Sequence, residues 1–227
     1  MDWQRAERIG LPEAIHAEAK SAEQIDAVLT EARRLRVALL ITRLGPEKFA
    51  QLEEAHRQLL DFDPVSRTAI LPGLAAPAHS ALSVGIVTGG LADMPTALEA
   101  ARTLAFSGVS HSVIPDVGVA GLWRLTDRLS EIRRFDVIIA VAGMEGALFS
   151  VLGGLVSAPI IAVPAPVGDG VAAGGITALH SALASCSSGL VAVNIGNGFG
   201  AAHAAMRMGR LQSAPAAPAT PLSEPRS

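Results

Sequence analysis

The chain has 227 residues, half of them hydrophobic, with no tyrosine and a formal net charge of −3 at pH 7. That charge argues against a nucleic-acid binder held by phosphate contacts, and the single cysteine excludes an internal disulfide. The first 20 residues are rich in charge and lack the apolar core of a signal peptide, so we expect a cytoplasmic protein.

The N-terminal third predicts a small mixed α/β unit over 1–75. Ser21 and Gln24 have the spacing of a capping box, in which each residue binds the other's backbone N–H at the start of a helix. Proline and glycine without charge mark the end of the unit. The expected elements are a helix from Ser21 to about Leu35, a strand over 37–41, a helix from Pro46 to about Leu60 and a linker over 72–79.

From residue 83 onward, strands and helices alternate five times. This alternation is typical of a doubly wound parallel sheet with helices on both faces, a three-layer α/β architecture that we expect over 83–210. A tail over 212–227, rich in alanine, proline and serine, is expected to be disordered. The expected strands are 83–87, 111–114, 136–141, 160–163 and 190–193, and the expected helices are 95–106, 120–132, 145–156, 173–185 and 199–209.

Between Gly146 and Met206 the only formally charged side chain is Asp169, so this stretch must be buried in lipid or in protein. Residues 146–168 are long enough to span a bilayer. Glycines and prolines interrupt any such helix, however, and flanking basic clusters are absent. We therefore expect no membrane span, and helices that pack against the sheet and against other subunits.

Glycine-rich loops follow the expected strands. Ligands of open α/β sheets bind beyond the carboxyl ends of the strands, where glycine lets backbone N–H groups approach an anion. One such loop could serve only to reverse the chain, but five on one edge favour a site for a phosphorylated ligand. The motifs of dinucleotide redox enzymes and of P-loops are absent. The candidate ligand contacts are Thr88, Gly89, Gly90, Asp93, Asp116, Arg124, Gly143, Met144, Gly168, Gly170, Gly174 and Asn197.

Two residues are candidates for the chemistry. Cys186 stands in glycine-rich, uncharged surroundings, and a thiolate is a far better nucleophile than a hydroxyl at neutral pH. The alternative is that this lone cysteine is a small buried hydrophobe. Glu145, in the loop after the third core strand, suits general acid–base catalysis or ligand contact, with an ordinary helix-start acid as the alternative. The histidines lack metal-ligand spacing, so we expect no metal site.

Several segments are characteristic of one known family: the runs 116–122, 141–148, 185–186 and 197–202, and in the N-terminal part Arg5, Arg8, Gly10, Pro12, Glu13, Lys20 and 42–44. In these segments the sequence resembles the LarB family of nickel-pincer cofactor biosynthesis, whose core is related to PurE, the aminoimidazole ribonucleotide carboxylase. The resemblance covers about residues 2–209 and implies a flavodoxin-like core. Its most specific feature is the run Gly-Met-Glu-Gly-Ala-Leu at 143–148 together with a downstream cysteine.

The resemblance implies carboxylation of the pyridinium ring of nicotinic acid adenine dinucleotide with CO2, and cleavage of its phosphoanhydride to release AMP. A thiolate that adds at ring carbon 4 produces an enamine, which captures CO2 at carbon 5. A base then removes the ring proton, and expulsion of the thiolate restores aromaticity. Cys186 matches the nucleophile of the family and Glu145 its acidic catalytic position. We expect no tightly bound organic cofactor and leave a requirement for Mg2+ open.

Four positions depart from the usual pattern of the family. Ala92, Trp123, Asp169 and Gly196 stand where serine, histidine, tyrosine and aspartate are usual. The resemblance therefore constrains the identity of the substrate less than it constrains the type of reaction. The alternatives are a diverged paralogue that acts on another nicotinate or pyridinium nucleotide, and a nucleotide-binding protein without catalysis.

The order of elements places Cys186 after a helix and before the last strand. That position belongs to the edge of the sheet opposite the glycine loops and Glu145. Either the helix ends elsewhere, or a neighbouring subunit supplies part of the site. A nearly chargeless stretch suits a subunit interface, and PurE-like cores assemble as octamers. We therefore expect a homo-oligomer, an octamer, with Cys186 near a ligand pocket at a subunit interface.

Overall fold

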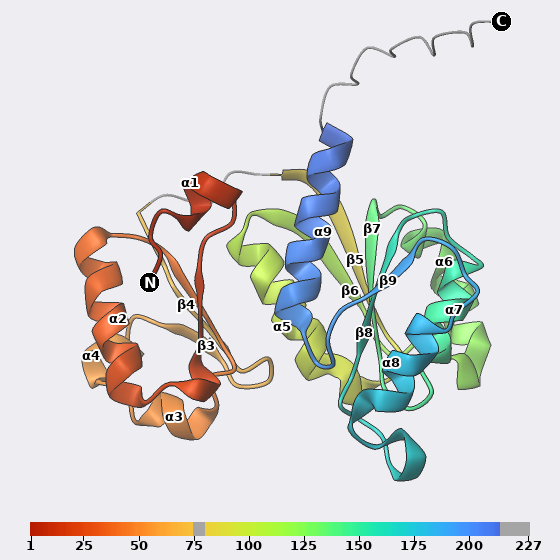
Figure 1. Cartoon of the computed structure of the whole chain (residues 1–227), viewed down its shortest axis with the longest axis horizontal. Helices are drawn as coiled ribbons and strands as arrows, with labels where there is room; N and C mark the ends of the chain where they lie inside the picture. The colour runs from red at the N-terminus through yellow and green to blue at the C-terminus, as the bar shows by residue number, and fades with distance from the viewer. Residues whose placement is uncertain (75–79, 214–227) are drawn as a thin grey trace, which may run out of the picture.

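The computed structural model describes residues 1–74 and 80–213 and contains two β-sheets (Figure 1). The smaller sheet has the strand order β1-β2-β4-β3, in which β2 is parallel to β1 and antiparallel to β4. Its strands are β1 (Ala14–His16), β2 (Leu39–Thr42), β3 (Asp61–Asp63) and β4 (Thr68–Leu71), and its helices are α1 (Arg5–Ile9), α2 (Ala22–Leu35), α3 (Pro46–Ala50) and α4 (Glu54–Arg57).

The capping box at the start of α2 is confirmed. The Gln24 N–H donates to the Ser21 hydroxyl at 3.3 Å, and the Ser21 N–H donates to the Gln24 side chain at 3.1 Å. The helix buries Ile25 and Leu29 against the sheet, so its apolar stripe faces the core of this unit.

The helix predicted from Pro46 to Leu60 is wrong: two short helices, α3 and α4, take its place. The carboxylate of Asp26 on α2 accepts the backbone N–H of Glu53, at 3.1 and 3.3 Å to its two oxygens. It also binds the ring of the buried His56 at 2.6 Å. A buried carboxylate that draws a backbone N–H out of a helical ladder ends the first helix and begins the second.

The larger sheet confirms the predicted parallel arrangement, with the strand order β6-β5-β7-β8-β9. Numbered from the first strand of the core, this is the flavodoxin-like order 2-1-3-4-5. The strands are β5 (Ser80–Thr88), β6 (Val109–Ile114), β7 (Val137–Ala142), β8 (Ile160–Pro164) and β9 (Leu190–Ala192).

Helices cover both faces of this sheet. On one face α5 (Met94–Phe106) and α9 (Gly198–Ser213) pack against the strands through alanine-rich surfaces. On the other face lie α6 (Leu122–Ile132), α7 (Ala147–Gly153) and α8 (Ile176–Leu183). The three-layer α/β fold is therefore as predicted, and every core strand and helix lies within a few residues of its expected position.

The predicted linker and tail fall mainly outside the described residues, which omit 75–79 and 214–227. Helix α9 continues to Ser213, so the first two residues assigned to the tail are helical instead. In the part of the chain that the structure describes, no helix is both long and apolar enough to cross a membrane.

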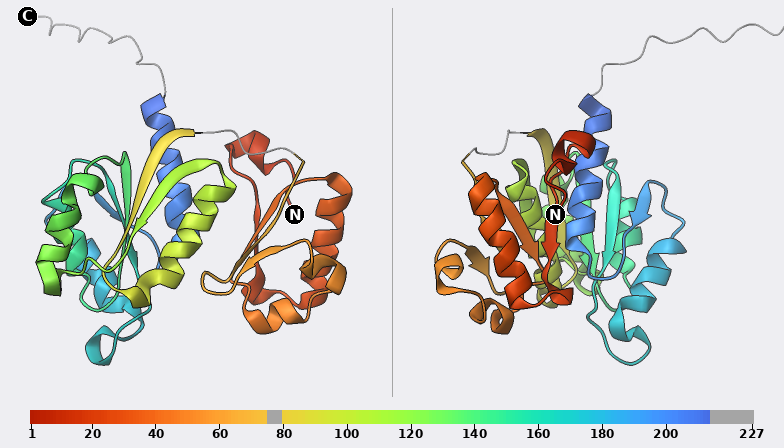
Figure 2. Two further views of the ribbon diagram at one scale, coloured as in Figure 1. Left: turned by 180° about the vertical axis from the view of Figure 1, so that it is seen from behind. Right: turned by 60° about the vertical axis from the view of Figure 1, so that its left-hand side comes forward.

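The N-terminal unit packs against the helical face formed by α5 and α9, which lie between the two sheets (Figure 2). Arg102 of α5 donates to the Thr68 hydroxyl at 2.7 Å and forms an ion pair with Asp61 at 3.0 Å. At the far end of α9, Arg210 donates to the carbonyl oxygens of Ile9 and Gly10. These contacts join the two units at well-separated points.

Candidate functional site

A cavity of about 280 Å3 lies beyond the carboxyl ends of the central core strands. Its walls come from the loops that follow β5, β6, β7 and β8, so four of the five predicted loops meet there. Residues of the predicted site that line it are Gly89, Gly90, Asp93, Arg124, Gly143, Met144 and Glu145.

Glycine is required in two of these loops because a side chain there would collide with the backbone of a neighbouring loop. A Cβ on Gly143 would lie 2.2 Å from the carbonyl oxygen of Val167, and one on Gly118 would lie 2.5 Å from that of Gly89. The N–H of Met144 also donates to the Val167 carbonyl at 3.1 Å. The loops after β7 and β8 are thus in direct backbone contact, and polar backbone groups form part of the cavity wall.

Asp93 is the buried acid of the cavity, with 4% of its surface exposed. It accepts the N–H of Gly90 at 2.8 Å, in the tight turn before α5. Burial raises the pKa of the Asp93 carboxyl, and hydrogen bonds from the backbone of Gly90, Gly143 and Gly89 oppose that shift. A carboxyl held in this way can accept a hydroxyl of a ligand, or donate to an anion when it is protonated.

Thr88 and Asp116 do not line the cavity but hold its loops in place. The Thr88 hydroxyl donates to the Gly90 carbonyl at 3.0 Å and accepts the Asp116 N–H at 3.1 Å, which ties the first two loops together. Asp116 has a positive φ of 57° and pairs with Arg124 at 2.7 Å. Arg124 binds Asp116 through Nη1, and its side chain is partly exposed where it lines the cavity, so the guanidinium can also bind an anionic ligand there.

Glu145 is exposed at the rim of the cavity, beside Met144, whose side chain is also exposed. The Glu145 carboxylate is therefore not enclosed within a single subunit. Exposed apolar side chains lie nearby: Leu91 in the turn before α5, and Leu122 and Trp123 in the first turn of α6. A second protein surface over this rim would bury the carboxylate and the apolar side chains together.

The remaining predicted contacts lie outside this cavity. Gly168, Gly170 and Gly174 belong to the long loop between β8 and α8, and do not line it. Asn197 begins α9, where its side-chain oxygen accepts the Gly200 N–H at 2.7 Å. That bond makes Asn197 a helix cap in this subunit.

Cys186 is exposed, in the loop between α8 and β9. The Ser185 hydroxyl beside it lies 2.8 Å from that of Ser150 on α7, and the Ser187 hydroxyl donates to the Ser150 carbonyl at 2.9 Å. The Ile160 N–H at the start of β8 binds Gly189 of the same loop. The thiol thus lies at the amino edge of the sheet, as its place in the chain predicted, whereas Glu145 lies at the carboxyl edge.

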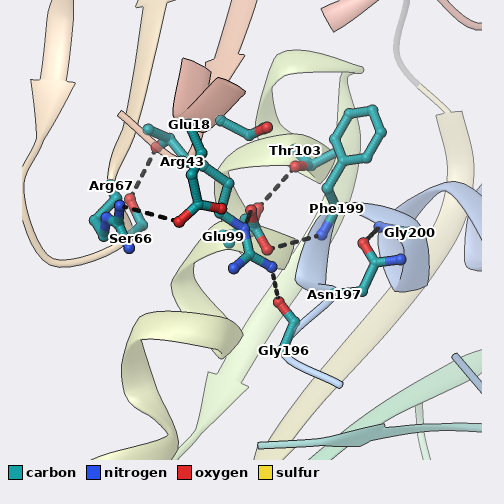
Figure 3. Close-up of polar contacts among 12 residues, drawn as sticks. Glu18, Arg43, Ser66, Arg67, Glu99, Thr103, Gly196, Asn197, Phe199 and Gly200 are labelled. Carbon is teal, nitrogen blue, oxygen red and sulfur yellow. Dashed lines mark hydrogen bonds and ion pairs between the residues drawn. The ribbon is translucent and has the colours of Figure 1, made fainter. Parts of the chain in front are cut away.

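A second cavity, of about 130 Å3, lies where the N-terminal unit meets the core, and sequence reasoning missed it. Arg43, at the end of β2, donates to the Glu99 carboxylate at 3.1 Å and to the Gly196 carbonyl (Figure 3). The other oxygen of Glu99 accepts the Phe199 N–H at 3.2 Å. Burial raises the pKa of the Glu99 carboxyl, and Arg43 opposes that shift. Arg43 and the loop before α9 are thus locked together.

The pattern described as AIR carboxylase matches residues 83–219, and the LarB/PurE-like N-terminal domain matches residues 1–72. The chain belongs to the LarB/PurE-related family. An uncharacterised protein of Methanocaldococcus jannaschii is 37% identical over 208 residues, which cover 88% of this chain and 80% of that protein. These matches support a carboxylase-type function.

Two solved structures from Treponema denticola, one of PurE and one of a substituted variant of PurE2, are similar to this chain. They are 25% and 26% identical to it, each with a TM-score of 0.47, and each match covers 57% of this chain and 80% of the other.

Proposed function

We propose that this protein carboxylates the pyridinium ring of nicotinic acid adenine dinucleotide with CO2 through a cysteine thioether, and hydrolyses the phosphoanhydride to release AMP. Its product is then a pyridinium-3,5-biscarboxylic acid mononucleotide, an intermediate of nickel-pincer cofactor biosynthesis. The observation that carries the proposal is the cavity walled by glycine backbone, Asp93, Arg124 and Glu145 in a chain of this family.

The cavity suits the nicotinate mononucleotide half of the substrate. The partly exposed guanidinium of Arg124 and the backbone N–H groups of the glycine loops are matched to a carboxylate or a phosphate. Asp93, at the start of α5, is placed to bind a ribose hydroxyl. Glu145, at the rim, is the acid–base group nearest to a ring that stands at the mouth of the cavity.

The proposed chemistry balances with these two groups alone. The Cys186 thiolate forms a C–S bond at ring carbon 4, and the ring becomes a neutral enamine. Carbon 5 of the enamine forms a C–C bond to CO2, and Glu145 accepts the proton that leaves carbon 5. The C–S bond then breaks, the thiolate departs with its electron pair, and the ring is again an aromatic pyridinium. A water molecule is consumed separately in cleaving the phosphoanhydride.

The thiol and the carboxylate belong to two subunits in this proposal. Strand β7 separates their edges of the sheet, and its six residues at about 3.3 Å each amount to roughly 20 Å. Reacting atoms must approach to about 3–3.5 Å. Exposed apolar side chains lie close to both sites, among them Met144 at the cavity and Leu183 near the thiol. We therefore propose a homo-oligomer, an octamer, in which Cys186 of one subunit reaches the cavity of its neighbour.

The experiment is to incubate the protein with nicotinic acid adenine dinucleotide and bicarbonate, with and without Mg2+, and to measure AMP and the doubly carboxylated mononucleotide by mass spectrometry. We expect both products in equal amounts from the wild type. Cys186→Ser should abolish them and leave nucleotide binding intact. Full activity of that variant would refute the thioether route, and Ser188→Ala, two residues along the same exposed loop, is the control.

A further inference from the structure

The second cavity contains a weakly paired positive charge. Of the charged side chains that line it, Arg43 and Glu99 satisfy each other. The third, Arg67, has 44% of its side chain exposed and approaches the Glu18 carboxylate only at 4.0 Å, in open solvent (Figure 3). An ion pair this long and exposed contributes little to the stability of the fold, so the Arg67 guanidinium can bind another partner at small cost in free energy.

The backbone around Arg67 is fixed even though its ion pair is loose. The Arg67 carbonyl accepts the Leu44 N–H at 2.8 Å, and its guanidinium lies over Gly45, 3.7 Å from where a Cβ would stand. The residue has a positive φ of 54° in the turn between β3 and β4. The N-terminal unit thus presents this cation at a defined place on the boundary with the core.

The two cavities lie on either side of two short chain segments. Asp93 lines the first and Pro95 the second, so the first turn of α5 separates them. In the same way Val167 lines the first and Pro166 the second. The first turn of a 13-residue helix adds its partial positive charge to that of Arg67 at this boundary.

The size of the first cavity requires such an extension if the substrate is a dinucleotide. Its 280 Å3 lies just below the roughly 300–1,000 Å3 of typical ligand pockets, which suits one nucleotide and not two. The second cavity, of about 130 Å3, has room for a phosphate group and continues in the direction of the N-terminal unit.

We propose that the cavity between the N-terminal unit and the core is an anion subsite, in which Arg67 binds the adenylate phosphate of a dinucleotide whose other half occupies the first cavity. This inference rests on the proposed function for the identity of the dinucleotide. It gives the N-terminal unit a role in selecting a dinucleotide over a mononucleotide, beyond its contacts with α5 and α9.

The test compares Arg67→Gln with Arg34→Gln. Arg34 is an exposed arginine of the same unit, paired with Glu31 on α2, so each change removes one positive charge and releases one acid. Dissociation constants are measured by calorimetry without bicarbonate, for nicotinic acid adenine dinucleotide and for nicotinic acid mononucleotide. Circular dichroism and thermal melting verify that each variant is folded.

We expect Arg67→Gln to weaken dinucleotide binding roughly tenfold or more and to leave mononucleotide binding unchanged. Arg67→Lys should recover part of the loss, since lysine binds phosphate as a point charge, and Arg34→Gln should match the wild type. Wild-type affinity of folded Arg67→Gln, or an equal loss for both ligands, would overturn the subsite. Dinucleotide binding that depends on Arg67 without any carboxylation would instead overturn the proposed function and support the subsite.

Discussion

Mixing two inactive variants tests whether one site is built from two subunits. If Cys186 and Glu145 of one site come from different chains, an equimolar mixture of Cys186→Ser and Glu145→Gln subunits contains sites in which both residues are intact. Random assembly gives each residue a one-half chance of being intact, so about one quarter of the sites are complete in a symmetric oligomer. If both residues of a site belonged to one chain, every site would lack one of them and the mixture would stay inactive.

The assay is AMP release after the variants are unfolded together and refolded, or exchanged under conditions that dissociate the oligomer. Differently tagged subunits show that hybrids have formed. We expect about one quarter of the activity of an equal amount of wild type.

The matched control mixes wild type with a chain that carries both substitutions. It should retain about one quarter of the activity for a shared site, and about one half for a site within one chain. Inactive hybrids, together with one half of the wild-type activity in the control mixture, would show that both residues of a site come from one chain. That result would refute a site shared between subunits.

Three further predictions concern single residues. Glu145→Gln should lower carboxylation by about 100-fold or more, the usual contribution of a general base, and a twofold loss would reduce Glu145 to a helix-start acid. Gly143→Ala should cost about 1–3 kcal/mol in urea unfolding because its Cβ would meet the Val167 carbonyl at 2.2 Å. Gly90→Ala, whose nearest contact would be at 3.9 Å, should be tolerated, and equal costs would contradict this account of the cavity wall. Burial lowers the pKa of His203 from its ordinary value of 6.5, so the unfolded chain binds a proton that the folded chain does not as the pH falls below that value. Urea midpoints of the wild type should therefore decline below about pH 6.5 more steeply than those of His203→Gln, and parallel curves would contradict a neutral, half-buried His203.

The core could be predicted from sequence because each of its elements carries its own local signal. Apolar strands end in glycine-rich loops, and the parallel order of the strands then brings those loops to one edge. The same topology placed Cys186 at the other edge, and that placement follows from the chain order alone. The long loop between β8 and α8 departs from this pattern. Its glycines follow a strand like the others, yet Gly170 and Gly174 do not line the cavity.

The contacts between the two units carry no local signal. Arg43 and Glu99 are 56 residues apart, and each looks like an ordinary surface charge in its own segment. The break between α3 and α4 has a similar origin, since the Asp26 carboxylate that binds the Glu53 N–H lies on another helix. Only packing shows that Asp26 and Glu99 are buried, so their partners could not be identified from periodicity.

Helix α5 connects the N-terminal unit to the first cavity. The helix begins next to Asp93 in the first cavity, and two turns further on its Glu99 is buried against Arg43. If Arg43 were replaced by glutamine with the N-terminal unit still in place, this carboxylate would lose its cation while it remained buried, and an unpaired buried charge costs several kcal/mol. The loop before α9 would lose the same anchor, because Arg43 also holds the Gly196 carbonyl. Arg43 therefore stabilises α5 and the loop before α9 from the side, and the cation of Arg67 is carried to the cavity edge by the same unit.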